Sequence, residues 1–301
     1  MKMLSDMGRK PLILLLVFLF SLHSIAEQEK VISTISEVPG GANLAVKLIK
    51  EIVKIQGEYT LNFPYEGQDR PTVTRLLADI DGGTTNLIWA LSSPEFEEKY
   101  QAVFYPLYFG MFGMRLPIVK KSEIDQFKNV RTVHDLKEFS AGQGVTWSDT
   151  TILRSNNLEV VGTNKYRNLF PMLEGDRFDY FPRAIHEPWG EVINFSEYEL
   201  AVDPYIMLRY KVGFYFFVRK DDVELYEYLV RGMETLTQSG RHKELFFQEE
   251  DVKLAMANAN LADRVIIDLH NPGITPQTPI DREELWFDIY HDPSKDVADQ
   301  Q

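Results

Sequence analysis

The apolar run LIWAL, from Leu87 to Leu91, decides the class of fold that the sequence predicts. It lies between a Gly82-Gly83 turn and the polar pair Ser92-Ser93. Such a short apolar run, bounded by turn residues, is typical of a parallel strand covered on both faces. Helix and strand patterns alternate on either side of it, which predicts an α/β fold.

Upstream of this run, the pattern changes between the two periods. Residues 31–36 (VISTIS) are expected to form a strand, and Pro39-Gly40-Gly41 a turn. An apolar stripe at helical spacing follows and is closed by Gly57; it consists of Leu44, Leu48, Ile52 and Ile55. A second strand is then indicated by the alternation of Tyr59, Leu61 and Phe63.

The same theme recurs downstream. Strands are predicted in FSAGQGV, EVVG, FDYF and VGFYFFVRK, and helices after WSDTT, up to MLEG, and over residues 221–240, where Gly240 stops the helix. Pro171 is expected in the first turn of its helix or at a kink. Two such groups predict two lobes: residues 27–110 with 210–301, and residues 111–209. The chain would cross between them near 108–112 and 208–213, and a cleft follows.

The first residues predict an export signal. Lys2, Arg9 and Lys10 precede the apolar run 12–22, and Ser24-Ile25-Ala26 offers a cleavage site after residue 26. The run is shorter than the roughly 20 apolar residues of a membrane-spanning helix. A cleaved signal is therefore expected, and an uncleaved N-terminal anchor is the alternative reading. Without cysteine, the chain has no site for lipidation, disulfides or thiolate metal ligands. We therefore expect a periplasmic monomer that is neither a lipoprotein nor stably inserted in a membrane.

The charge balance restricts the partners. The chain has 32 Lys and Arg against 45 Asp and Glu, a net charge of -13, and removal of residues 1–26 makes it more negative. Nucleic acids and anionic membranes are therefore unfavourable partners. The six histidines are scattered and form no metal-binding spacing, so neither a metal nor another cofactor is expected.

Several segments, in their order, resemble the type II periplasmic solute-binding proteins of the polar-amino-acid-binding kind. The matching stretches are RLLADIDGGTTNLIWALSS, YPLY, DLKEFSAGQG, WSDTT, MLEGDRFDYFPR and the stretch from GFYFFVRK to RHKELF. The resemblance implies a two-lobed Venus-flytrap fold with a double interlobe crossing, which closes on a small solute. The tail DRVIIDLHNPGITPQTPIDREELWF looks like an addition found in a subset of such proteins.

The resemblance also implies where a ligand is contacted: at strand ends and helix N-termini. Ser92 and Ser93 supply hydroxyls at the expected turn, but glutamates follow where the family has an arginine that grips a carboxylate. Arg115, just past the first crossing, is one replacement, although a charge at the hinge surface is the simpler reading. In the family an acidic residue after the 178–181 strand meets a ligand ammonium, and Arg183 lies one residue short of that position.

The candidate site therefore has two sides. The guanidinium of Arg183 offers two parallel N–H donors to an anionic group of the ligand, or else it forms an ion pair with Glu187. The start of the second-lobe helix provides N–H groups for an anion, or its side chains merely cap the helix. The ligand-binding candidates are Trp89, Ser92, Ser93, Arg115, Trp147, Ser148, Asp149, Thr150, Tyr180, Arg183 and Glu187. For the aromatic members, packing in the core is the alternative.

The leading functional hypothesis is a periplasmic binding protein that captures a small polar solute, an amino acid or related small carboxylate, for an ABC-type transporter. A second hypothesis keeps the fold but gives the closed form a membrane sensor as its partner. A third is a periplasmic enzyme on the same scaffold, because a fold does not fix a function. No catalytic motif supports the third, so the sequence predicts a protein that is not an enzyme.

Overall fold

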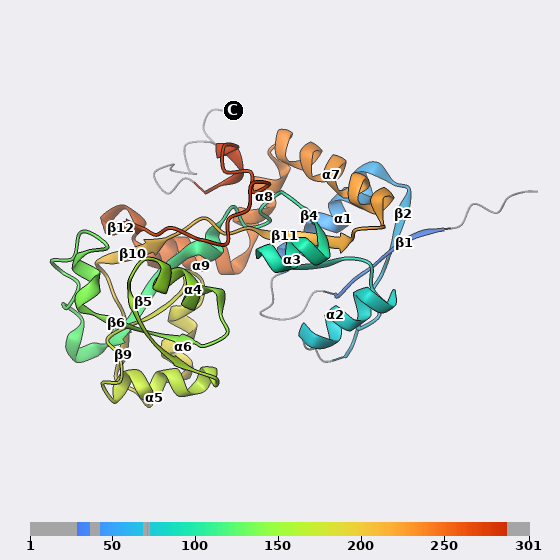
Figure 1. Ribbon diagram of the computed structural model, residues 1–301. Coiled ribbons are helices and arrows are strands. Elements are labelled where there is room, and N and C mark those ends of the chain that lie inside the picture. The colour runs from blue at the N-terminus through green and yellow to red at the C-terminus, as the bar shows by residue number, and fades with distance from the viewer. Residues whose placement is uncertain (1–28, 37–42, 69–70, 72, 288–301) are drawn as a thin grey trace, which may run out of the picture.

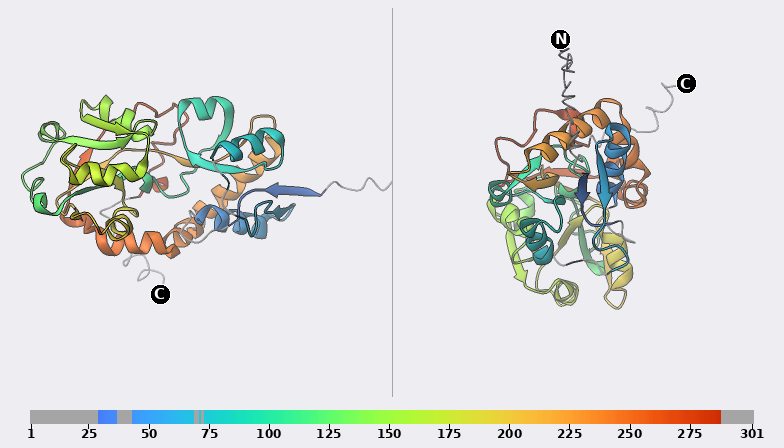
Figure 2. Two further views of the ribbon diagram at one scale, coloured as in Figure 1. Left: turned by 90° about the horizontal axis from the view of Figure 1, so that it is seen from below. Right: turned by 90° about the vertical axis from the view of Figure 1, so that its right-hand side faces the viewer.

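The computed structural model describes residues 29–36, 43–68, 71 and 73–287. The predicted signal peptide and the Pro39-Gly40-Gly41 turn lie outside these residues. Figure 1 shows two α/β lobes side by side, and the view from below in Figure 2 shows the same arrangement. Within the described residues, none of the helices combines the length and the hydropathy that a bilayer-spanning helix requires.

The first lobe contains two small sheets covered by helices. A parallel pair, β1 and β2, lies beside an antiparallel sheet of order β3-β11-β4. The strands are β1 (Lys30–Ser33), β2 (Tyr59–Asn62), β3 (Ile88–Leu91), β4 (Tyr100–Val103) and β11 (Phe214–Arg219). The helices are α1 (Leu44–Gln56), α2 (Val73–Gly82), α3 (Pro94–Lys99), α7 (Val223–Gln238) and α8 (Arg241–Gln248).

The predicted stripe on α1 is confirmed over most of its length. Leu44, Leu48 and Ile52 are fully buried in the largest hydrophobic cluster, because positions three and four apart share one face of a helix. Ile55 is the exception, with half of its surface exposed at the last turn. The helix contacts α7 and α8 through this face.

The second lobe is built on a five-stranded sheet, in which β5 pairs with β8, β9 and β10, and β12 with β10. A parallel pair, β6 and β7, lies beside it. The strands are β5 (Met114–Lys120), β6 (Ser140–Gly144), β7 (Glu159–Thr163), β8 (Phe181–Ala184), β9 (Leu200–Val202), β10 (Ile206–Arg209) and β12 (Val265–Asp268). The helices are α4 (Ser148–Ser155), α5 (Leu169–Glu174) and α6 (Pro188–Asn194); α9 (Glu250–Ala259) follows α8.

Short 3-10 helices connect several of these elements. They are η1 (Met111–Gly113), η2 (Lys121–Glu123), η3 (Asp135–Glu138), η4 (Tyr166–Asn168), η5 (Leu261–Asp263) and η6 (Glu283–Leu285). Pro171 is the third residue of α5 and so lies in its first turn, as the sequence predicts. A proline is tolerated there because the first N–H groups of a helix have no partner within the helix.

Two strand expectations differ from the structure. The run 87–91 forms β3, but its ladder in the described residues is antiparallel to β11, not parallel. The strand expected at 178–181 begins only at Phe181 and continues to Ala184, while Tyr180 forms an isolated bridge with Ala141. Apolar character reports burial but not the direction of the neighbouring strand, which explains the first difference.

The lobes are joined by two adjacent crossings. One runs from β4 to β5 and the other from β10 to β11, and the backbone N–H of Tyr210 donates to the carbonyl of Gly113 at 3.0 Å between them. A Cβ atom on Gly113 would lie 1.9 Å from the Tyr210 carbonyl oxygen. Only glycine allows the two backbones to approach this closely.

The sequence division assigns the whole C-terminal segment to the first lobe, but the structure places part of it in the second lobe. β12 pairs in parallel with β10, so residues 265–268 extend the sheet of the second lobe. The chain then returns: Arg282 forms an ion pair with Glu234 of α7 at 3.0 Å, and the N–H of Phe287 donates to the Phe109 carbonyl at 2.8 Å. Residues 265–287 thus contact both lobes, and in Figure 1 this red segment runs from β12 to α8. We call it the C-terminal strap.

Candidate functional site: a cleft between the lobes

A cavity of about 630 Å³ lies where the two lobes and the C-terminal strap meet. The first lobe contributes the end of β3 and the start of α3, and the second lobe contributes the start of α4. This volume is in the range of small-molecule sites. The lining residues are Leu91, Ser92, Ser93, Pro94, Glu95, Val145, Thr146, Trp147, Ser148, Thr151, Ile152, Val212, Asn271, Pro272 and Gly273.

The first-lobe wall carries acceptor oxygens. Ser92 donates its hydroxyl to a carboxylate oxygen of Glu97 at 2.5 Å, which leaves its oxygen lone pairs as acceptors. Ser93 caps α3, since its side-chain oxygen accepts from the Phe96 N–H at 3.2 Å. Hydrogen bonds from its own backbone N–H and from Ser93 lower the pKa of Glu95, so its exposed carboxylate is ionised at neutral pH.

The second-lobe wall is the first turn of α4. Trp147 occupies the N-cap position without a side-chain hydrogen bond to the helix, so the turn has no side-chain cap of its own. Asp149 and Thr150 are buried beneath it, and the Thr150 hydroxyl donates to the Gly144 carbonyl at 2.7 Å. Of the four predicted residues in this turn, Trp147 and Ser148 line the cavity, whereas Asp149 and Thr150 support the turn from inside.

Asp149 belongs to a buried cluster around Arg115. An Nη atom of Arg115 lies 2.8 Å from Asp149 Oδ1, and its Nε donates to the Tyr210 hydroxyl at 2.7 Å. The same Tyr210 hydroxyl also bonds to Asp149. Burial lowers the pKa of Arg115, but Asp149, Tyr210 and Glu187 outweigh it and raise the value overall. Arg115 is thus a buried structural cation and not the exposed hinge charge that the sequence favours.

Arg183 is held in a similar way. Its Nε donates to both carboxylate oxygens of Glu191, at 2.9 and 2.8 Å, and an Nη atom donates to Glu187 at 2.8 Å. The guanidinium also lies over the rings of Trp147 and Phe181, at 5.3 and 4.9 Å from their centroids. The ion pair with Glu187, the alternative reading of the sequence, is therefore present, and a second carboxylate completes it.

The two arginines and their three carboxylate partners have a formal charge of -1. Arg115 and Arg183 contribute +2, while Asp149, Glu187 and Glu191 contribute -3. Neither arginine lines the cavity, and both are at least nine-tenths buried. Glu187 is the most accessible member, with 29% of its side chain exposed. An anionic group would find no uncompensated cation in this cluster.

Two predicted aromatic residues lie in the core instead of the cavity. Tyr180 is fully buried with its ring nearly perpendicular to that of Phe127, and Trp89 packs against Phe216 in the first lobe. Neither belongs to the cavity lining. The expectation that Trp89 and Tyr180 line the ligand site is therefore corrected. Both residues pack in the core, which was the alternative interpretation.

The strap contributes to the cleft in a way that sequence patterns do not predict. Asn271 donates from its side-chain amide to the Lys211 carbonyl at 2.9 Å and accepts from the Gly273 N–H at 2.8 Å, which fixes a turn against the crossing. The Asn-Pro-Gly triplet at 271–273 indicates a turn, but nothing local indicates that it borders the cleft. The described residues contain no group of three or more His, Cys, Asp or Glu side chains that could hold a metal ion.

Comparison with solved structures identifies the fold of this chain. No known family and no curated protein matches the sequence. Among solved structures, the probable amino-acid ABC transporter extracellular-binding protein ytmK from Bacillus subtilis is 16% identical, with a TM-score of 0.55 over 74% of this chain and 98% of that chain. The amino acid ABC transporter substrate-binding protein AbpA from Streptococcus pneumoniae is 20% identical, with a TM-score of 0.48 over 75% and 95%. The chain therefore has the two-lobed α/β fold of the amino-acid ABC transporter solute-binding proteins.

Proposed function

We propose that this protein binds a small zwitterionic solute, an amino acid or a related small carboxylate, in the cleft between its lobes. The observation that carries the proposal is the cavity of about 630 Å³, whose walls come from both lobes and from the strap. A ligand that contacts both lobes stabilises the closed arrangement over the open one. The similar protein from Bacillus subtilis is described as a probable amino-acid ABC transporter extracellular-binding protein, which agrees with this proposal.

The walls differ in the charge that they favour. The oxygen of Ser92 and the ionised carboxylate of Glu95 favour an ammonium group on the first-lobe side. On the second-lobe side, the first turn of α4 has N–H groups and the positive end of a helix dipole, which favour a carboxylate. A zwitterion whose two groups point to opposite walls satisfies both preferences.

The closed, loaded protein would deliver its solute to an inner-membrane ABC permease, without chemical change to the solute. Export to the periplasm, cleavage near residue 26 and a free, monomeric mature chain belong to the same proposal. Contact with a membrane sensor is the alternative use of the closed form. Ligand-dependent association with a permease or with a sensor domain separates the two.

The first experiment identifies the solute. The mature chain is screened by thermal shift against amino acids and small carboxylates, and hits are measured by calorimetry. A solute at 100 times its Kd adds roughly 2.7 kcal/mol to the free energy of unfolding. The absence of any stabilising zwitterion, with a stabilising neutral or doubly anionic compound instead, would contradict the proposed class.

The second experiment tests the role of the α4 N-terminus. Ser148→Pro removes the first N–H of the helix at a position where proline fits, since Trp147 before it is already extended. We expect Kd to rise about tenfold, because a charge-assisted hydrogen bond is lost. Ser148→Ala keeps the N–H and is the matched control. Equal affinity of both variants for the solute would show that the N-terminus of α4 does not bind it.

A further inference from the structure

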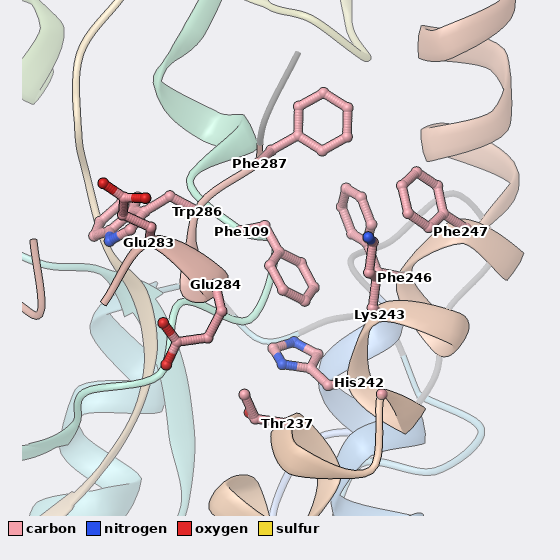
Figure 3. A pocket seen from close by; sticks show the side chains of 11 residues that line it. Phe109, Thr237, His242, Lys243, Phe246, Phe247, Glu283, Glu284, Trp286 and Phe287 are labelled. Atoms are coloured by element: carbon pink, nitrogen blue, oxygen red, sulfur yellow. The ribbon is translucent and has the colours of Figure 1, made fainter. Parts of the chain in front are cut away.

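A second cavity, of about 290 Å³, lies in the first lobe, under the end of the strap and away from the cleft. Figure 3 shows the rings of Phe109, Phe246, Phe247 and Phe287 around it, with His242 and Thr237 below them. An engineered cavity on the order of 150 Å³ already accepts benzene. The lining residues are Phe109, Thr237, Gly240, His242, Lys243, Phe246, Phe247, Glu283, Glu284, Trp286 and Phe287.

The cavity forms where α7 turns into α8. Gly240 has a φ of 74°, a left-handed conformation that suits glycine, and it reverses the chain after α7 so that Thr237 and His242 border the same space. The strap closes the opposite side through the Phe287 N–H, which donates to the Phe109 carbonyl at 2.8 Å. The ring of Phe109 packs on the imidazole of His242 with centroids 4.3 Å apart, which fixes the orientation of the imidazole.

Among the residues that the structure describes, two buried polar atoms of side chains that line this cavity have no hydrogen-bond partner. Nε2 of His242 lies 2.9 Å from the Leu107 carbonyl oxygen, which can only accept, so Nε2 carries the proton. Nδ1 is then an acceptor, and it is buried without a donor. The Oγ1 atom of Thr237 is also buried and unpartnered. Unsatisfied buried groups destabilise a fold and need an explanation.

The pKa of His242 supports a neutral imidazole in which Nδ1 is an acceptor. Burial lowers its pKa to about 4, and the Leu107 carbonyl offsets this only in part. The imidazole is therefore neutral at physiological pH, with one donor nitrogen and one acceptor nitrogen. A group that donates to Nδ1 and accepts from the Thr237 hydroxyl would satisfy both orphaned atoms, and a hydroxyl group does both.

We propose that this cavity is a second ligand site, which binds a small aromatic alcohol of the phenol class. The ring packs among Phe109, Phe246 and Phe247, and the hydroxyl group donates to Nδ1 of His242 and accepts from Oγ1 of Thr237. Aromatic walls with a few fixed polar groups are the usual composition of small-molecule sites. The site lies within the first lobe and the strap, away from the cleft that the solute would occupy.

The test compares phenol with toluene, which has the same shape but no hydroxyl group. Binding of each to the mature chain is measured by calorimetry or by ligand-observed NMR. We expect phenol to bind at least tenfold more tightly. A merely apolar groove would prefer toluene, the more hydrophobic compound, so equal or tighter binding of toluene, or no binding of either, would overturn the proposal.

A variant pair locates the bound hydroxyl. Thr237→Val keeps the shape of the side chain and removes an oxygen without a partner, so we expect a folded protein that binds phenol about fivefold to tenfold more weakly. Thr235→Val, on the exposed face of the same helix, is the control and should bind phenol normally. With ¹⁵N-labelled histidine, the Nδ1 resonance of His242 should shift with phenol and not with toluene. An unmoved Nδ1 resonance, or unchanged affinity in Thr237→Val, would place phenol elsewhere.

Discussion

At the level of single residues, the carboxylate partners of Arg183 show that its role is structural. The sequence predicts that the Arg183 guanidinium either binds an anionic ligand group or forms an ion pair with Glu187. In the structure, Arg183 has two carboxylate partners and lies over aromatic rings. A buried ion pair of this kind is costly to break from one side, because the remaining charge stays buried. The role of Arg183 is thus to hold α6 against β8 beneath the cleft.

Replacement of Arg183 is expected to affect stability first. Arg183→Ala leaves Glu191 buried without its cation, so we expect the free energy of unfolding to fall by about 3 kcal/mol or more. Urea unfolding measures this loss, and Arg177→Ala, at an exposed position nearby, is the control. A ligand role predicts instead a roughly hundredfold weaker affinity with normal stability, and that outcome would restore the anion-binding hypothesis.

His242 also leads to a prediction at the residue scale, one about pH. Its pKa is about 4 in the folded protein because of burial, against an ordinary value of 6.5 in the unfolded chain. Between pH 6.5 and pH 4 the histidine takes up a proton in the unfolded state but not in the folded state. The free energy of unfolding therefore falls as the pH drops towards 4 and then levels off. The difference between these two pKa values corresponds to about 3 kcal/mol of the free energy of unfolding.

Urea unfolding at pH 7, 5.5 and 4.5 measures this dependence. The groups that face His242 from neighbouring elements are Phe109, the Leu107 carbonyl and, at the rim of its cavity, Lys243, Glu283 and Glu284. His242→Gln retains an amide donor for Leu107 but cannot titrate, so its stability should change less over this interval. The exposed His134→Gln is the control. An unchanged pH slope in His242→Gln would refute the assignment.

At the scale of elements, the contact between the two crossings fixes how the lobes meet. Gly113→Ala would place a methyl group 1.9 Å from the Tyr210 carbonyl, and the neighbouring backbone cannot yield as a flexible side chain does. We expect destabilisation by roughly 1–3 kcal/mol, as for other overpacking substitutions. Gly190→Ala in α6 is the control, because no atom of the described residues lies within 4 Å of its added Cβ and alanine favours a helix. Equal stability of the two variants would show that the crossings separate easily.

At the scale of the whole molecule, the strap adds connections to the double crossing. It pairs with β10 in the second lobe, lines the cleft at Asn271, and is tied to α7 in the first lobe through Arg282 and Glu234. A hinge with two connections moves with few restraints, whereas a segment that contacts both lobes restrains the amplitude of opening. We therefore expect the strap to favour the closed arrangement.

Small-angle scattering checks this expectation. With a saturating solute the radius of gyration should fall, and in Arg282→Ala/Trp286→Ala the ligand-free protein should be more open and the fall larger. Arg231→Ala, an exposed position on α7, is the control. A scattering curve that does not change with solute would contradict hinge closure, and an identical change in the double variant would contradict the restraint by the strap.

The sequence alone determined the features that depend on local spacing. The stripe Leu44, Leu48 and Ile52 predicts α1, Gly240 predicts the end of α7, and the order of elements predicts the two-lobed α/β fold, because neighbours along a helix or strand set its buried face. The contacts between distant segments depend instead on the tertiary structure. The pairing of β12 with β10 and the bond from His242 to Leu107, 135 residues away, depend on how the finished lobes pack, and no local period encodes them. For the same physical reason the cleft residues Ser92 and Ser148 could be predicted from element ends, whereas Asn271 and the partners of Arg183 could not.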